Sequence, residues 1–261
     1  MQIGVVGVGA ITSDVIEAIE ELHPGVHTFY LSPRSAERST KLTSKYKNFI
    51  QCESNQDVVD KSELVFIGVL PTQIDELLPT LNFRADQIIA SMAAGKPPSY
   101  LKPLIAPATK VAQLIPLPMI EYKVGPIVIC PRIPEISSLL EGLGDLIEFD
   151  DDSQIQYFSA TSAAMSSYFA LINSVIDWTH KQGIDFELSA KYVTSMVEAI
   201  GVKANRIDPN KLIEQPVKHE TPGGLNESTR VNLENENWFA GLPNQLDYLI
   251  KVFIPGLKNK K

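Results

Sequence analysis

Cysteine is scarce in this sequence, and its scarcity excludes several classes of protein. Cys52 and Cys130 are the two cysteines, and neither belongs to a Cys-x-x-Cys pair or stands beside a histidine. A disulfide framework or a cysteine-based metal site needs more cysteines at closer spacing. We therefore expect two buried, reduced thiols and no metal site, as in a cytoplasmic protein.

Basic residues are fewer than acidic ones, and long hydrophobic runs are also scarce. The chain has 23 Lys and Arg against 31 Asp and Glu, which gives a net charge of -8. A general nucleic-acid binder needs a basic face, so we expect no nucleic-acid partner. The most apolar stretch, residues 158–176, is interrupted by Ser, Thr and Asn, and no signal peptide is recognisable at the start. These features predict a soluble protein with no membrane partner.

Short apolar runs alternate with amphipathic stretches as far as about residue 150. This alternation is typical of a parallel, doubly wound α/β sheet. The expected strands are residues 3–7, 26–31, 49–52, 64–70, 88–93, 111–114, 127–130 and 147–149. After the acidic turn at 150–153 only helical patterns follow. The sequence thus predicts a Rossmann-type domain over 1–150 and an all-helical domain over 151–261.

The helical half contains one segment that predicts a partner subunit. Residues 154–181 read as a single long helix that is apolar almost all round in its middle, and such a helix must be enclosed by other helices. Further helices are expected over 186–200, 227–238 and 243–253. These helices are too few to enclose the long apolar helix within one chain. We therefore expect a homodimer, or a multiple of one, formed through the helical domain.

A glycine-rich turn follows the first expected strand and opens the first helix, at residues 11–22. Gly7 permits the tight turn, and Gly9 lets a pyrophosphate approach the backbone and the helix N-terminus. The third fingerprint position is Thr12 rather than Gly or Ala, and its hydroxyl or that of Ser13 is a candidate donor. The turn predicts a dinucleotide site made by residues Gly7, Gly9, Ala10, Ile11 and Thr12.

The end of the second strand indicates which dinucleotide binds. NAD-binding domains place Asp or Glu there to hold the ribose 2′-hydroxyl, whereas this chain has no carboxylate before Glu37. Ser32, Arg34 and Ser35 occupy the position instead. A cation flanked by hydroxyls suits a 2′-phosphate, so we expect NADPH as the cofactor.

Two further loops follow strands at the same edge of the expected sheet. Val69, Leu70 and Pro71 begin the loop after the fourth strand, where nucleotides lie in open α/β sheets. Ala93, Ala94 and Gly95 end the fifth strand, and their small side chains leave room for a nicotinamide ring. A tight turn without a ligand would explain the second loop almost equally well.

In the order of these features the chain resembles the pyrroline-5-carboxylate reductase family over essentially its whole length. Residues 65–72 (VFIGVLPT) are similar to the family's Val-Phe-x-x-Val-Lys-Pro-Gln, and residues 91–95 (SMAAG) to its Ser-x-Ala-Ala-Gly. Residues 220–224 (ETPGG) are similar to its Thr-Ser-Pro-Gly-Gly-Thr-Thr. The resemblance implies a Rossmann domain, a helical dimerisation domain, and hydride transfer from NAD(P)H to a cyclic imino acid.

The resemblance also implies a substrate loop formed by Pro222, Gly223, Gly224, Leu225 and Asn226. Backbone N–H groups of this turn, at the start of a helix, suit a substrate carboxylate. Asn226 stands where the family has a hydroxyl facing the substrate nitrogen, so it is the candidate catalytic residue. His219 lies close by, although a solvated histidine is the better interpretation.

The substrate half departs from the family pattern at several positions, among them Leu70, Leu117 and Leu225. Two alternatives to pyrroline-5-carboxylate reduction therefore stay open. One is an imine reductase with another substrate, and the other is an NADP(H)-binding dimer without turnover.

Overall fold

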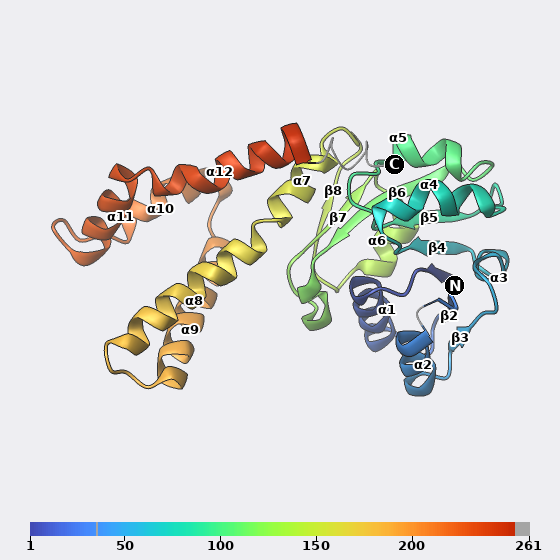
Figure 1. Ribbon diagram of the computed structural model, residues 1–261, viewed down its shortest axis with the longest axis horizontal. Helices are drawn as coiled ribbons and strands as arrows, with labels where there is room; N and C mark the ends of the chain where they lie inside the picture. The colour runs from blue at the N-terminus through green and yellow to red at the C-terminus, as the bar shows by residue number, and fades with distance from the viewer. Residues whose placement is uncertain (35, 254–261) are drawn as a thin grey trace. The chain divides into compact units, whose positions relative to one another are not determined.

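The computed structural model describes residues 1–34 and 36–253 of the chain (Figure 1). The chain divides into two compact units. Unit 1 comprises Met1–Ala160 together with the segment that begins at Val252, and unit 2 comprises Thr161–Lys251. All strands of the described part of the chain belong to unit 1.

Unit 1 is built on one eight-stranded sheet with the strand order β3-β2-β1-β4-β5-β6-β7-β8. Its strands are β1 (Gln2–Val6), β2 (Thr28–Leu31), β3 (Phe49–Gln51), β4 (Leu64–Ile67), β5 (Ile88–Ser91), β6 (Lys110–Pro116), β7 (Pro126–Cys130) and β8 (Asp145–Glu148). The order 3-2-1-4-5-6 is that of doubly wound dinucleotide-binding sheets. The α/β fold class predicted from the sequence is therefore confirmed.

One strand departs from the expected parallel arrangement. β7 runs antiparallel to β6 and parallel to β8, whereas all other neighbours in the sheet are parallel. The reason lies in the connection 117–125, which holds only a short 3-10 turn over Pro118–Tyr122. A parallel crossover needs about a dozen residues or more, so this connection can only return the chain in the opposite direction.

Helices cover both faces of the sheet, which explains why its central strands are apolar on both sides. The helices that begin in unit 1 are α1 (Ala10–Leu22), α2 (Ala36–Lys45), α3 (Asn55–Lys61), α4 (Ile74–Leu77), α5 (Pro98–Leu101), α6 (Pro134–Leu140) and α7 (Ile155–Ser162). The cores place α1, α2 and α6 against one face and α3, α4 and α5 against the other. Ile155 of α7 packs on Val128 and Cys130 of β7.

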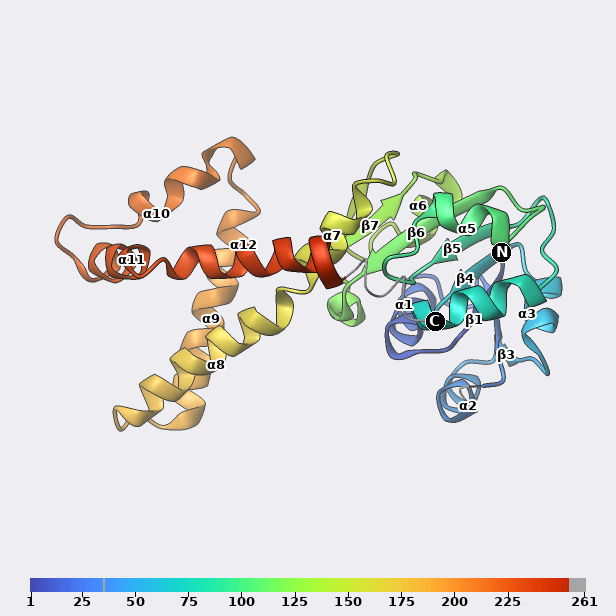
Figure 2. The ribbon, with the colours of Figure 1, turned by 45° about the horizontal axis from the view of Figure 1, so that its top comes forward.

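Unit 2 consists of helices and their connections (Figure 2). Its helices are α8 (Met165–Lys181), α9 (Phe186–Ala204), α10 (Gln215–Lys218), α11 (Leu225–Asn235) and α12 (Trp238–Tyr248), and a π-helical turn over Leu249–Phe253 follows. Within the described ranges, no helix combines the length and the apolar character that crossing a bilayer demands.

Two expected helix boundaries are wrong. The single helix expected over 154–181 is interrupted at 163–164, because the Ala164 N–H donates to the Thr161 carbonyl only three residues back, at 3.0 Å, and tightens the backbone there. The break expected before Pro243 falls instead at Glu236 and Asn237. Asn237 takes the left-handed conformation (φ 55°), which asparagine tolerates, and Pro243 lies inside α12.

Candidate functional site

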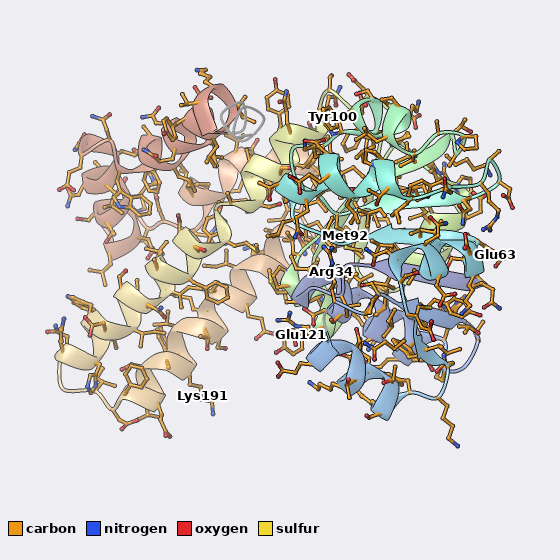
Figure 3. All side chains as sticks on the ribbon, turned by 45° about the vertical axis from the view of Figure 1, so that its right-hand side comes forward. Arg34, Glu63, Met92, Tyr100, Glu121 and Lys191 are labelled. Carbon is orange, nitrogen blue, oxygen red and sulfur yellow. The ribbon has the colours of Figure 1, made fainter. Side chains whose placement is uncertain are left out.

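The loops that follow β1, β2, β4 and β5 meet at one edge of the sheet. Their order is fixed by backbone hydrogen bonds, from the Gly68 N–H to the Val6 carbonyl at 2.8 Å and from the Met92 N–H to the Ile67 carbonyl at 2.9 Å. Arg34 and Met92 follow two of these strands (Figure 3). The connection from β1 leads to β2 on one side, and the connection from β4 leads to β5 on the other. Such a point, where the strand order reverses, is the crevice in which open α/β sheets bind their ligands.

The glycine turn after β1 has the geometry that the fingerprint predicts. Gly7 has a φ of +92°, and a Cβ there would lie 2.6 Å from the Val69 side chain and 2.8 Å from the Gly68 backbone. Gly9 is the N-cap of α1, and a Cβ on it would meet nothing closer than the Gly68 carbonyl oxygen at 3.6 Å. The protein itself thus requires Gly7, whereas the space beside Gly9 is open.

Thr12 has a role other than that of the hydroxyl donor expected from the sequence. Its side chain is buried, and its hydroxyl donates to Met92 Sδ at 3.8 Å. A Cβ on Gly68 would lie 2.1 Å from Thr12 Oγ1, so Thr12 occupies the space that Gly68 leaves open. The close helix–strand contact that the third fingerprint glycine usually permits is made here by the glycine of the neighbouring strand. The Ser13 hydroxyl is likewise engaged, with the Gly9 carbonyl at 2.7 Å.

At the end of β2 the three expected contacts differ in what they offer a ligand. Ser32 is fully buried, and its Oγ accepts the Gly7 N–H at 3.0 Å, so it braces the glycine turn. Arg34 is exposed and makes no hydrogen bond or ion pair with any residue in 1–34 or 36–253. Ser35 lies outside the described residues. Arg34 is therefore an uncommitted cation at the position that distinguishes the two dinucleotides.

The turn at 93–95 is held by a residue that the sequence analysis missed. Gln113 on β6 is buried, and its Nε2 donates to the Ala93 carbonyl at 3.0 Å. The Ala93 N–H donates to Ser91 Oγ at 3.3 Å, and Gly95 has a φ of +74°. A glutamine in the middle of the apolar run 110–116 was the available signal, because a buried amide must be satisfied by hydrogen bonds.

A second missed cluster links the loop after β5 to the helix that follows β4. Lys96 is buried, and its Nζ donates to Asp75 at 2.7 Å and to the Tyr100 hydroxyl at 3.0 Å. The Tyr100 hydroxyl donates to the other oxygen of Asp75 at 2.5 Å. These bonds, first that from Lys96, hold the pKa of the Asp75 carboxyl below its usual range. The cluster joins the segment that follows Gly95 to α4, and it uses two of the three N–H donors of Lys96. Leu70 itself is 66% exposed.

In unit 2 the turn at 222–226 leads into α11 as expected, but two of its N–H groups are already used. The Gly223 N–H donates to Glu227 at 2.5 Å, and the Gly224 N–H donates to the Thr221 carbonyl at 2.7 Å. Gly223 has a φ of +72°, and Gly224 caps the helix. The N–H groups of Leu225 and Asn226 have no partner among the described residues. An anion at this turn could therefore use these two N–H donors, but not those of Gly223 and Gly224.

Asn226 and His219 are joined by a bond that fixes the asparagine amide. Asn226 Nδ2 donates to the His219 carbonyl at 3.0 Å, which leaves the exposed Oδ1 as an acceptor. The His219 ring lies between the Gln215 carbonyl at 2.7 Å from Nδ1 and the Lys203 ammonium at 2.6 Å from Nε2. A carbonyl can only accept and an ammonium can only donate, so these contacts suit the ring tautomer with its proton on Nδ1 and with Nε2 as the acceptor. His219 therefore has no proton to give from a free position.

The turn is held in shape by an ion pair across it. Arg230 on α11 makes two hydrogen bonds to Glu220, at 2.5 and 3.0 Å, and one to Glu234 at 2.7 Å. The bonds from Arg230 lower the pKa of the Glu220 carboxyl. A bidentate pair of this kind restrains both ends of the segment 221–229.

The fold and the glycine turn define unit 1 as a dinucleotide-binding domain of the Rossmann type. Residues 2–95 match the family model described as NADP oxidoreductase coenzyme F420-dependent. Over 94% of this chain and 92% of the relative, the sequence is 22% identical to the pyrroline-5-carboxylate reductase of Pseudomonas aeruginosa.

Solved structures agree in fold over nearly the whole chain. The 1-pyrroline-5-carboxylate reductase of Streptococcus pyogenes superposes with a TM-score of 0.82, at 22% identity over 99% of this chain and 98% of that one. The pyrroline carboxylate reductase of Plasmodium falciparum with NADP bound gives 0.80, at 16% identity over 95% and 94%. These matches agree with the resemblance seen in the sequence: the chain is similar in sequence and in fold to pyrroline-5-carboxylate reductases over nearly its whole length.

Proposed function

We propose that this protein is an NADPH-dependent reductase of a C=N bond, and that its substrate is a cyclic imino acid, first of all pyrroline-5-carboxylate, which it reduces to proline. The full-length similarity to pyrroline-5-carboxylate reductases carries the proposal. When bound, NADPH would supply the hydride that adds to the imine carbon. The protein's part is then to hold the two reactants in position, which can account for most of the catalysis. NADPH oxidation with a panel of cyclic imines tests it, and steady turnover of none of them would refute it.

The cofactor residues follow from the geometry of unit 1. The open side of Gly9 and the N-terminus of α1 would receive the pyrophosphate, and Arg34 would bind the 2′-phosphate. One charged contact of about 1.4 kcal/mol predicts at least tenfold tighter binding of NADPH than of NADH. Arg34→Ala should abolish that preference, with Arg38→Ala, in the first turn of α2, as the matched control. Equal affinities in the wild type would contradict the assignment.

For the substrate we propose that Asn226 binds an imine that arrives already protonated. Its Nδ2 is committed to the His219 carbonyl, so Oδ1 is the atom available to accept an iminium N–H. An amide cannot supply a proton near neutral pH. The rate should therefore follow the iminium fraction of the substrate and fall as the pH rises past the imine pKa. Asn226→Leu should lower kcat/KM, and Asn226→Thr should retain activity. An unchanged kcat/KM in Asn226→Leu would remove Asn226 from the site.

We also propose a homodimer, or a multiple of one, formed through unit 2. Only Ala164, Ile176, Ser189 and Val193 are buried among the described residues of this unit. Large apolar side chains of α8 and α9 are exposed instead, including Phe169 at 60% and Tyr192 at 70%. Exposed apolar area of this extent marks an interaction surface. Sedimentation at low concentration should show no folded monomer, and a monodisperse helical monomer would contradict the proposal.

Two alternatives keep the cofactor site and change the rest. Leu117 and Leu225 reshape the residues expected around the substrate, and Leu225 is 88% exposed, which favours a different imine as the substrate. A non-catalytic NADP(H)-binding dimer has less support, because it gives no use to the braced turn at 222–226. The two unpaired, buried thiols fit a reducing compartment, which we take to be the cytoplasm.

A further inference from the structure

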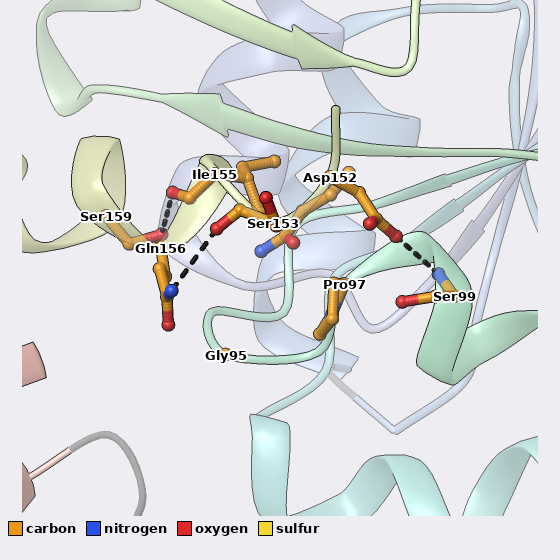
Figure 4. Close-up of a pocket in the computed structure, with 9 residues that line it drawn as sticks. Gly95, Pro97, Ser99, Asp152, Ser153, Ile155, Gln156 and Ser159 are labelled. Carbon is orange, nitrogen blue, oxygen red and sulfur yellow. Dashed lines mark hydrogen bonds between the residues drawn. The ribbon is translucent and has the colours of Figure 1, made fainter. Parts of the chain in front are cut away.

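A pocket of about 240 Å³ lies in unit 1 between the segment that follows β5 and the start of α7. Gly95 and Pro97 are two of its lining residues (Figure 4). Its other lining residues are Ser99, Gln113, Asp152, Ser153, Ile155, Gln156 and Ser159. No lysine or arginine lines it among the described residues, and one carboxylate does. The pocket is too small for a dinucleotide and suits a molecule with few heavy atoms.

Gln113 gives the first indication of what the pocket binds. Only 1% of this residue is exposed, and its Nε2 is committed to the Ala93 carbonyl at 3.0 Å. Its Oε1 is buried and has no hydrogen-bond partner. Exchanging the two amide atoms would set Oε1 against a carbonyl oxygen, so the orientation is determined. A buried acceptor without a donor is uncommon and calls for a missing donor.

The other polar side chains of the pocket also offer acceptors. One oxygen of Asp152 accepts the Ser99 N–H at 2.8 Å, and no described residue donates to the other oxygen. The Nε2 of Gln156 donates to the Ser153 carbonyl at 3.2 Å, and its Oε1 has no donor in the described chain. The wall thus combines one negative charge with amide oxygens and lacks a compensating cation.

We propose that this pocket binds a small organic cation that carries a primary ammonium group and no carboxylate. An ammonium has three N–H donors and no acceptor, so it complements a wall of acceptors. Its charge is attracted by Asp152, and a hydrogen bond between two charged groups is stronger than one between neutral groups. An amino acid fits less well, because its own carboxylate would face Asp152 without a cation to offset it. The proposal involves no step of the reduction.

The test is a titration of the full-length, isotope-labelled protein without cofactor, followed by amide NMR shifts. Ethylammonium chloride is the probe, at an ionic strength held constant with sodium chloride. Tetramethylammonium has the same charge without N–H donors, and L-proline adds a carboxylate to an amine. We expect saturable shifts at Ser99, Gln156 and the Gln113 side chain with ethylammonium only.

Two variants and a control locate the site. Asp152→Asn keeps an acceptor for the Ser99 N–H but removes the charge, and it should weaken ethylammonium binding at least tenfold. Gln113→Met, which is similar in length, should weaken it as well. Glu135→Gln removes a carboxylate that lies outside this pocket and should change the affinity less than twofold. Absence of saturable shifts, equal binding of tetramethylammonium or L-proline, or unchanged binding in Asp152→Asn would overturn the proposal. None of these results depends on imine turnover.

Discussion

Adding one methyl group should impair different properties at the two glycines Gly9 and Gly68. At Gly68 it should lower the stability of the fold, and at Gly9 it should lower the affinity for NADPH. In Gly68→Ala the new Cβ would lie 2.1 Å from Thr12 Oγ1 and 2.5 Å from the Gly7 carbonyl oxygen. Backbone must therefore move, since neither contact is with the end of a flexible side chain. In Gly9→Ala the nearest atom is 3.6 Å away, and the φ of -81° suits alanine. Its methyl group projects into open space that we assign to the pyrophosphate.

The sizes of the two effects follow from these distances. Overpacking a close-packed site usually costs about 1–3 kcal/mol, and we expect Gly68→Ala to lie near the upper end, at about 3 kcal/mol. Gly9→Ala should change the free energy of unfolding by less than about 0.5 kcal/mol, as a surface substitution does. Its NADPH affinity should nevertheless fall by about tenfold or more, equivalent to about 1.4 kcal/mol. Urea unfolding followed by circular dichroism gives the first quantity, and fluorescence titration with NADPH gives the second.

A double variant tests whether Thr12 is the cause of the crowding. Thr12→Ala removes Oγ1 and should recover part of the stability lost in Gly68→Ala, but not all of it, because the clash with the Gly7 carbonyl remains. We expect a coupling energy of about 1 kcal/mol between the two sites. Additive effects would show that Thr12 does not fill the space beside Gly68. A Gly68→Ala protein as stable as the wild type would refute the reasoning altogether.

Three further predictions concern individual side chains. Burial raises the pKa of the Cys52 and Cys130 thiols to about 11. Both thiols should therefore react slowly with Ellman's reagent at pH 8 in the folded protein, and rapidly once urea unfolds the chain. A fast reaction of the folded protein would contradict this prediction. Burial, together with the nearby Glu121 and Glu17, raises the pKa of the Asp14 carboxyl. Because the folded state holds this proton more tightly than the unfolded state, the free energy of unfolding decreases as the pH rises through that pKa. Asp14→Asn should therefore raise the free energy of unfolding at pH 7, by less than about 1 kcal/mol in a urea titration, and should not raise it at pH 3. Arg230→Met removes the ion pair across the turn at 222–226, so it should raise KM for the imine more than KM for NADPH. Equal changes in the two KM values would contradict the role of Arg230 in holding the turn.

Much of unit 1 could be predicted from local patterns, because the residues that form each strand are apolar and close together in sequence. The edge where the cofactor loops meet follows from the strand order alone. The reversal of β7 was missed, because it depends on the length of a connection rather than on the strand's own residues. The interrupted helix was missed because Ala163 and Ala164 favour helix, and only the bond to Thr161 reveals the break.

The roles of single polar residues at the site were harder to predict. Ser32 and Thr12 have the right residue types for ligand contacts, but both are buried, and each hydroxyl makes a hydrogen bond within the protein, Ser32 as an acceptor and Thr12 as a donor. Gln113 and Lys96 looked unremarkable, because their partners lie on other strands and helices. Which side chain satisfies a buried group is decided by tertiary packing, which a single sequence does not display.

The most direct test of the proposed reaction is to count proline formed per NADPH consumed. The purified protein is mixed with pyrroline-5-carboxylate and NADPH, absorbance reports the cofactor, and chromatography reports the amino acid. The account predicts one proline for each NADPH, a slower reaction with NADH, and loss of the preference in Arg34→Ala. NADPH binding without any proline, at every pH at which the substrate is protonated, would contradict the account.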